Sequence, residues 1–124
     1  MATSDRLQSD RPLTLRVERR EGVAIVTLEG ACTMEVSHQI RHCLVGLATE
    51  QVPLIVLDMA QLDFIDSVGL GGIIAAHLRG RHHDGHLRLV APNEHIREVL
   101  DLTRLSRLFQ IYPTVADAVS ATPA

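Results

Sequence analysis

The sequence is poor in the residues that several common functions need. Its 124 residues include no tryptophan, one tyrosine and two phenylalanines, so aromatic platforms for stacking nucleic-acid bases are not expected. All twelve basic residues are arginine, and the absence of lysine excludes Schiff-base chemistry and a lysine-containing P-loop. The formal net charge of −3 gives no general attraction to nucleic acid or to an anionic membrane.

The chain also has no apolar run of the length that a membrane span needs, and residues 1–10 lack a signal-peptide core. Its two cysteines, Cys32 and Cys43, do not have the spacing of metal ligands, and nothing in the sequence indicates an oxidising compartment. We therefore expect a cytoplasmic protein that needs no cofactor or metal and has neither nucleic acid nor membrane as a partner.

A small group of histidines stands near the end of the second expected helix: His77, His82, His83 and His86. No cysteine or well-spaced carboxylate accompanies them. We therefore expect solvated side chains, with His77 partly packed, rather than a metal site.

The sequence contains enough apolar residues for one folded domain. Apolar residues make up 46% of the chain and charged residues 22%, as in an ordinary globular protein. The length supports a hydrophobic core without disulfide or metal staples. We expect residues 1–12 to form a flexible tail and residues 13–122 to form a single domain.

Apolar periodicity and capping residues predict nine helices and strands. In chain order they are strand 13–19, strand 23–28, helix 34–49, strand 54–57, helix 67–79, strand 87–90, a helix capped at Asn93, strand 108–112 and a short helix capped at Thr114. Gly30 is expected to end the second strand, and Thr33 to cap the first helix, which places Cys43 in the core. Leu78 is expected on the buried side of the second helix.

The order of these elements predicts the fold class. The first two strands are expected to form an antiparallel hairpin, and the later strands alternate with helices. Right-handed crossovers then give an α/β fold, a mixed β-sheet of about five strands flanked by about four helices. Sites in such sheets gather where strands end and helices begin.

The stretch that follows strand 54–57 lies at such an edge. It carries three carboxylates, one serine and three glycines: Asp58, Asp63, Asp66, Ser67, Gly69, Gly71 and Gly72. We expect Asp58 to end the strand and Ser67 to open the helix. This edge is therefore the expected functional site.

Three chemical interpretations of Ser67 follow from the residue types. An α/β-hydrolase elbow needs Gly-x-Ser-x-Gly, but Ile65 stands two residues before Ser67. A phosphate-binding loop at the glycines lacks Gly-Lys-Ser, and Asp66 would repel phosphate, so nucleotide binding is a minor alternative. Thirdly, Ser67 could accept a phosphoryl group, which adds about −1.5 to −2 charges beside Asp66 and would weaken the binding of a docked partner.

The residues alone favour a plainer interpretation of the same stretch. Each glycine inside a helix costs roughly 0.8–1 kcal/mol relative to alanine, so three glycines close together need a reason. They would let the helix pack closely on the sheet, with Ser67 only capping its N-terminus. The alternative is that they leave a bare helix surface that another protein can approach.

The motif Asp66-Ser67-Val68-Gly69-Leu70-Gly71 resembles the STAS family, in particular the bacterial anti-sigma-factor antagonists. The resemblance covers roughly residues 13–121 and includes the stretch from Val99 to Thr103. It implies a mixed sheet flanked by helices and a function in partner switching. The unphosphorylated protein would bind an anti-sigma factor that is also a GHKL-type serine kinase, which frees a sigma factor.

In this interpretation the kinase phosphorylates Ser67 with Mg-ATP, and a PP2C-type phosphatase reverses the reaction. The protein is then a substrate and a binder, not an enzyme. The expected partner-binding residues lie around the motif: Thr33, Asp63, Asp66, Ser67, Val68, Gly69, Leu70, Gly71 and Gly72.

Two positions depart from the family pattern. After the second strand the family usually has Gly-Glu-Leu-Asp, where this chain has Gly30-Ala31-Cys32-Thr33, and Arg104 stands where glycine is common. STAS domains also serve in stress-signalling complexes, lipid-transport assemblies and transporter tails. A scaffold that is not phosphorylated is therefore the main alternative function.

Overall fold

The computed structural model describes residues 11–33 and 36–121. Within these ranges five strands form one sheet in the order β1-β2-β3-β4-β5. The strands are β1 (Thr14–Arg20), β2 (Val23–Cys32), β3 (Leu54–Ile65), β4 (His86–Val90) and β5 (Gln110–Tyr112). The β1–β2 pair is antiparallel and the other three pairs are parallel, which confirms the predicted hairpin and mixed sheet.

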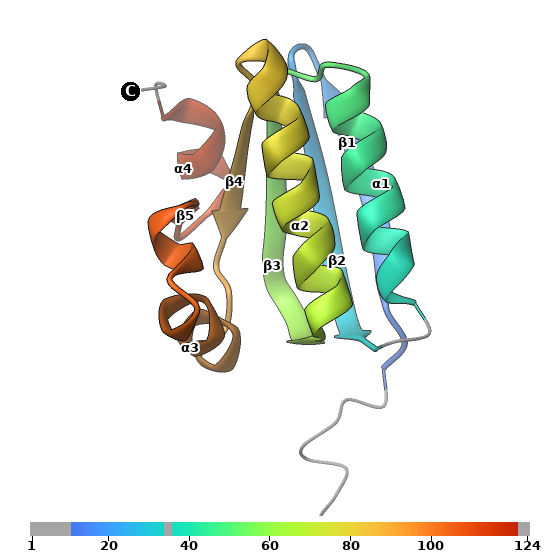
Figure 1. Ribbon diagram of the computed structural model, residues 1–124, viewed down its shortest axis with the longest axis vertical. Helices are drawn as coiled ribbons and strands as arrows, with labels where there is room; N and C mark the ends of the chain where they lie inside the picture. Colours follow the sequence, from blue (N-terminus) through green and yellow to red (C-terminus); the bar gives the residue numbers. More distant parts are fainter. Residues whose placement is uncertain (1–10, 34–35, 122–124) are drawn as a thin grey trace, which may run out of the picture.

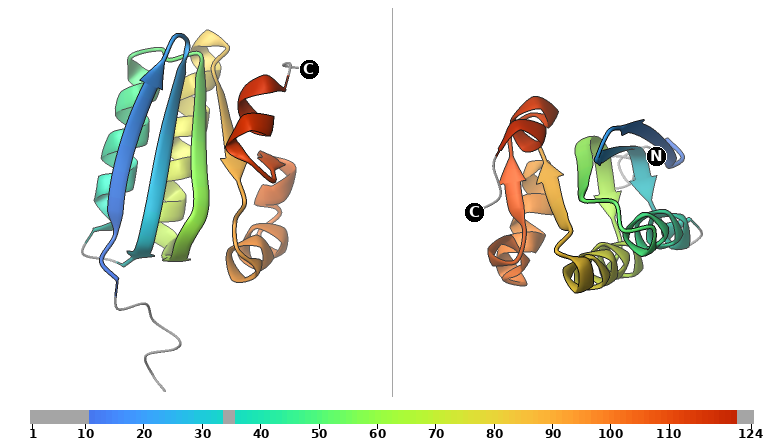
Figure 2. Two further views of the ribbon diagram at one scale, coloured as in Figure 1. Left: turned by 180° about the vertical axis from the view of Figure 1, so that it is seen from behind. Right: turned by 90° about the horizontal axis from the view of Figure 1, so that it is seen from above.

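Helices connect or follow the parallel strands. They are α1 (Ser37–Thr49), α2 (Ser67–Gly80), α3 (Glu94–Leu102) and α4 (Val115–Ser120), with short 3-10 turns at η2 (Arg81–His83) and η3 (Leu105–Arg107). The α1 and α2 helices lie side by side on one face of the sheet (Figure 1). Seen from above, α4 lies on the opposite face (Figure 2). None of the helices in the described ranges is both long and apolar enough to cross a membrane.

The main core lies between the sheet and the α1–α2 layer. Ile40 and Leu44 of α1 and Ile73 of α2 are fully buried there against Leu57 and Met59 of β3. A smaller core on the other face joins Ile25, Val56, Val90 and Ala118. Burial of apolar surface in both layers stabilises the fold at about 25 cal/mol per Å² removed from water.

Both central strands are longer than predicted. The apolar stretch of β3 stops at Leu57, yet the strand continues to Ile65, so Asp58 does not end it. On the face of the sheet opposite α1 and α2, the smaller core covers only the beginning of β3. After Leu57 that face is open, so polar side chains such as Asp58 and Gln61 are tolerated there. The β2 strand likewise runs past Gly30 to Cys32.

Gly30 bends β2 instead of ending it. Its φ of +93° is in the left-handed region, and the pairing of β2 with β3 shifts register between Gly30 and Ala31. A Cβ at this position would collide with the backbone carbonyl of Pro12. Glycine is therefore needed for both the backbone angle and the close approach of a neighbouring segment.

The start of α1 differs from the prediction. The N-cap is Val36, which makes no side-chain cap bond, and Thr33 instead accepts hydrogen bonds at its backbone oxygen from the N–H groups of Val36 and Ser37. Met34, the predicted first helical residue, lies outside the described ranges. Cys43 is only partly buried at the edge of the main core.

Later elements follow the prediction more closely. Asn93 caps α3 and Thr114 caps α4 with their side chains, as predicted. Leu108, predicted to begin the last strand, instead precedes it as the residue after η3. Leu78 was expected on the buried side of α2 but is 49% exposed, because the buried side is built from Gly69, Gly72, Ile73, Ala76 and Gly80.

Candidate functional site

Ser67 is the first residue of α2 and is exposed at the carboxyl end of β3. Its side chain does not cap the helix, contrary to the plainer interpretation of the sequence. Asp66 is the N-cap, and its Oδ1 accepts a hydrogen bond of 2.8 Å from the N–H of Gly69. The Ser67 hydroxyl makes no hydrogen bond within the described residues, so it is available for chemistry or for contact with a partner.

The second carboxylate oxygen of Asp66 faces the protein interior. Oδ2 is buried and has no hydrogen-bond partner in the part of the chain that the structure describes. The Asp66 carboxylate is therefore only partly exposed to solvent. A carboxylate at a helix N-terminus is favourable because the helix dipole is positive there.

Two of the three glycines of the motif serve the packing of α2. A Cβ on Gly69 would lie 2.7 Å from the Cys32 Sγ atom, and a Cβ on Gly72 would lie 2.8 Å from the Cα of Arg41 in α1. Both residues are buried. The small size of Gly69 lets α2 approach the sheet at β2, as the close-packing interpretation predicted. The small size of Gly72 instead lets α2 approach the neighbouring helix α1, which was not predicted.

Gly71 is different, because nothing lies within 4 Å of the position that its Cβ would take. It therefore leaves the bare helix surface that the second interpretation predicted. Val68 stands beside it and is 45% exposed, which is high for a large apolar side chain. Ser67, Val68 and Gly71 thus offer an accessible strip on α2.

The end of β2 brings Thr33 to the same edge. The N–H of Asp66 donates a 3.1 Å hydrogen bond to the carbonyl of Cys32, the residue before Thr33. Thr33 is exposed. The two parallel strands therefore place Thr33 next to the start of α2, and an exposed hydroxyl residue ends up on each side of this junction.

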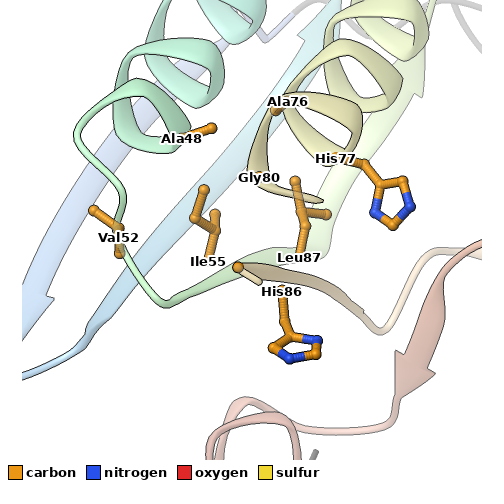
Figure 3. Close-up of a pocket in the computed structure, with 9 residues that line it drawn as sticks. Ala48, Val52, Ile55, Ala76, His77, Gly80, His86 and Leu87 are labelled. Carbon is orange, nitrogen blue, oxygen red and sulfur yellow. The ribbon is translucent and has the colours of Figure 1, made fainter. Parts of the chain in front are cut away.

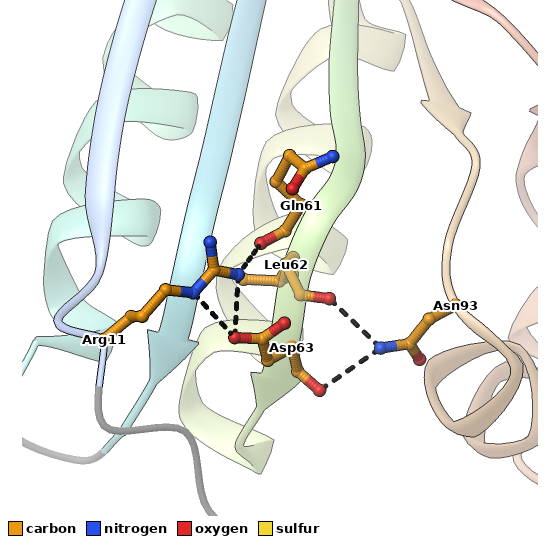
Figure 4. Close-up of polar contacts among 5 residues, drawn as sticks. All are labelled: Arg11, Gln61, Leu62, Asp63 and Asn93. Carbon is orange, nitrogen blue, oxygen red and sulfur yellow. Dashed lines mark hydrogen bonds and ion pairs between the residues drawn. The ribbon is translucent and has the colours of Figure 1, made fainter.

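Asp63 is held by an arginine that the sequence pattern did not single out. The Arg11 guanidinium donates from Nε and Nη2 to Asp63 Oδ2, at 3.2 and 2.8 Å, and also from Nη2 to the carbonyl of Gln61 (Figure 4). The Asn93 side chain donates to the carbonyls of Leu62 and Asp63 from the other side. These contacts join the segment before β1, the end of β3 and the start of α3.

Cys32 lies under the start of α2 and is fully buried. Burial and the nearby Asp66 carboxylate raise the pKa of the Cys32 thiol to about 11, and the backbone N–H of Asp66 acts in the opposite direction. The protonated thiol is thus an apolar packing group beneath Gly69. The sequence did not predict this packing role, because Cys32 was noted only for lacking metal-ligand spacing and for standing where the family usually has an acidic stretch.

The predicted partner-binding residues therefore divide into two groups. Thr33, Ser67, Val68 and Gly71 are accessible at one edge, and Asp63 is exposed but paired with Arg11. Gly69 and Gly72 are buried, Leu70 is half-buried against the main core, and Asp66 is mostly used in capping. Direct contact with a partner is available to the first group.

The histidines are placed largely as expected. His77 is half-buried with its ring edge-on to Phe109, at 5.1 Å between centroids, and His82 and His86 are exposed. His83 is not simply solvated, since its Nε2 lies 2.9 Å from the carbonyl of Ala48. No group of three or more potential ligand side chains suitable for a metal ion occurs among the described residues.

Comparison with known proteins points to one family. The family model described as the STAS domain matches residues 14–118. The anti-sigma F factor antagonist of Paenibacillus polymyxa is 28% identical over 109 residues, which are 87% of this chain and 93% of that one.

Solved structures agree with this match. The crystal structure of an anti-sigma factor antagonist from Mycobacterium paratuberculosis has a TM-score of 0.80 at 26% identity, and the match covers 91% of this chain and 96% of that chain. The Bacillus cell fate determinant SpoIIAA in its phosphorylated form shares the fold, with a TM-score of 0.71 at 19% identity over 86% of this chain and 96% of that chain.

Proposed function

Because the chain belongs to the STAS domain family, we propose that it is an anti-sigma-factor antagonist that acts by partner switching. In the unphosphorylated state it binds an anti-sigma factor that is a GHKL-type serine kinase, and a sigma factor is released. Phosphorylation of Ser67 abolishes this binding, and a PP2C-type phosphatase restores it. The protein itself is a binding partner and a phosphorylation substrate.

The observation that carries this proposal is the position of Ser67. Its hydroxyl is exposed, and the helix cap is provided by Asp66, so modification of Ser67 does not remove a bond that the fold needs. A phosphate in the first turn of α2 would also gain about 0.3–1 kcal/mol from the helix dipole. The folded protein can therefore carry the modification.

The accessible strip around Ser67 supports a partner surface that a phosphate would disrupt. Val68 and Gly71 allow close approach of another protein, and Thr33 extends the surface to the end of β2. A phosphate would bring about −1.5 to −2 charges into this contact. Like-charge repulsion and desolvation of that group would cost the complex on the order of 3–4 kcal/mol, a roughly hundred- to thousandfold loss of affinity.

In the transfer step, the Ser67 oxygen attacks the γ-phosphorus of ATP. The new O–P bond forms as the bond to the β-phosphate oxygen breaks, ADP leaves, and the hydroxyl proton passes to a base of the kinase. The kinase would hold ATP with Mg²⁺, which would supply neutralisation of the charge on the transferred group.

The test is the intact mass of the protein after incubation with Mg-ATP and each GHKL-type kinase encoded near its gene. We expect a gain of one phosphate in the wild type and in Thr33→Ala, and none in Ser67→Ala. Thr33→Ala is the matched control because Thr33 also presents an accessible hydroxyl at this edge. If the wild type gains no phosphate with any of these kinases, the scaffold function replaces the switch.

A further inference from the structure

A second groove lies at the end of α2 that is remote from Ser67. It has a volume of about 550 Å³, within the range of small-ligand sites. Residues from α2, from the turn that follows it and from the starts of β4 and β5 line this groove. Its main lining residues are His77, Arg81, Asp84, His86, Leu108 and Gln110. We call it the histidine groove.

Part of the groove wall is held in place by packing. The His77 ring is held edge-on against Phe109, and the groove wall at Leu87 is buried in the main core. Inward lies a cavity of about 10 Å³ that shares His77, His86 and Leu87 with the groove (Figure 3). That cavity is about the size of one water molecule, so a larger ligand would occupy the outer groove.

Two hydrogen-bond donors of the groove have no partner within the described residues. The Arg81 guanidinium and the His86 ring make no hydrogen bond or ion pair within the described residues, although Asp84 lines the same groove. Some arginines elsewhere pair with carboxylates, among them Arg11 and Arg16, whereas Arg107 is unpaired like Arg81 within the described residues. Burial lowers the pKa of His77, and the charges of Arg81 and His86 lower it further. Arg81 and His86 therefore lie near enough to His77 to disfavour its charged form.

We propose that the histidine groove binds a small anion that carries a phosphate or carboxylate group. Arg81 and His86 donate hydrogen bonds to the anion, His77 adds a third donor when protonated, and Gln110 supplies a neutral one. The anion relieves the repulsion among these cations. Leu108, which is 37% exposed, offers an apolar contact for the rest of the ligand.

The binding is linked to proton uptake. With the His77 imidazole neutral, the charges of Arg81 and Asp84 in the groove cancel, and protonation of His77 makes the groove positive. A further titratable side chain on η2 near this wall, His83, is directed to the carbonyl of Ala48. An anion in the groove therefore favours the charged form of His77, raises its pKa, and binds more tightly when that ring is protonated.

The experiment is a titration of the full unphosphorylated chain with inorganic phosphate and, separately, with succinate, followed by NMR of the histidine ring signals. Sodium chloride at equal ionic strength is the reference. We expect saturable shifts of the His77 and His86 ring signals, with a raised pKa for His77. Saturation by phosphate alone identifies a phosphate site, and saturation by both anions identifies a general anion site.

Two variants test the assignment of the donors. Arg81→Gln should weaken anion binding about tenfold, because it removes a charge-assisted hydrogen bond. Arg79→Gln is the matched control, since Arg79 is exposed on the same helix and does not line the groove. Equal loss in both variants, or shifts no larger than those with chloride, would overturn the proposal. None of these readouts depends on Ser67, so failure here leaves the switch proposal intact.

Discussion

Gly71 and Gly72 are neighbours in α2 with opposite surroundings. Gly72 touches the backbone of Arg41 in α1, whereas the space beside Gly71 is open. Glycine is therefore required for packing at one position, and at the next it only lowers helix stability. In the sequence the two residues are indistinguishable, because the difference depends on which side of the helix faces α1.

This difference gives a prediction with an internal control. Gly72→Ala should lower the free energy of unfolding by about 1–3 kcal/mol, since the new methyl group meets a backbone that has to move. Gly71→Ala should raise it by up to about 1 kcal/mol through helix propensity. Urea unfolding of both variants checks this, and equal effects would show that the α1–α2 approach is not the reason for Gly72.

A second prediction at the residue scale concerns Cys32 and alkaline pH. The pKa of this thiol is about 11 in the folded protein and near its ordinary value of 9.0 when unfolded. The unfolded state therefore loses the proton first, so stability is fully present below about pH 9 and falls as pH rises toward 11. The slope is at most about 1.4 kcal/mol per pH unit.

The measurement is urea unfolding between pH 8 and 11 for the wild type and for Cys32→Ala. The variant is less stable at every pH because it loses buried volume, but its pH dependence over this window should be flatter. Parallel curves for the two proteins would mean that other groups cause the alkaline loss.

At the scale of the element, α4 depends on one buried arginine. Arg88 of β4 is 2% exposed, and its Nη1 donates to the carbonyls of Ala118 and Ala121 at 2.7 and 2.9 Å. Its Nε donates to the side chain of Gln110, and the guanidinium lies over the ring of Tyr112. A helix of only six residues is thereby tied to the sheet at its C-terminal end.

We predict that Arg88→Met destabilises the protein by about 2–3 kcal/mol, because the two carbonyls lose a charged donor. The amide protons of α4 should exchange faster than those of α2 in the same variant. Arg107→Met is the control, since Arg107 is exposed and its side chain makes no hydrogen bond or ion pair within the described ranges. Unchanged exchange in α4 would contradict the role of Arg88.

The element scale also shows why the ends of the strands were hard to predict. The chain order of the strands and the opening hairpin followed from apolar runs and turns, whereas the pairing of the later strands was not predicted. The β3 strand is covered on both faces only up to Leu57. After Leu57 the buried residues Met59 and Leu62 are not spaced with the regular alternation of a strand. The carboxylates between and after them are also typical of loops, so the sequence pattern of this part of β3 looks like that of a loop. Coverage of one face by α4 is a tertiary property that no local pattern contains.

The position of the candidate site was predicted from the sequence, but the hydrogen bonds within it were not. The helix start at Ser67 and the strand-to-helix edge were evident from Asp66, Ser67 and the glycines, and the fold places them as expected. The identity of the cap was missed, because serine and aspartate are both good N-caps. Arg104, which stands where glycine is common, has a φ of +65°, so the backbone there does take the conformation that favours glycine.

At the scale of the whole molecule, charge is distributed unevenly. The chain has 15 acidic residues, yet α1 and α2 contain none, and their charged side chains are arginines with several histidines. The helix layer beside Ser67 is therefore neutral to basic, with Asp66 as a partly buried exception. A phosphate on Ser67 would introduce the strongest negative charge on this face.

Partner switching by Ser67 depends on the dissociation constant between the kinase partner and the protein, measured with and without phosphate on Ser67. We expect phosphorylation to weaken binding roughly a hundred- to thousandfold, and Ser67→Ala to bind like the unphosphorylated wild type. Ser67→Asp should weaken binding less than the phosphate, since it adds a smaller charge. Equal dissociation constants for the phosphorylated and unphosphorylated protein would rule out a switch at Ser67.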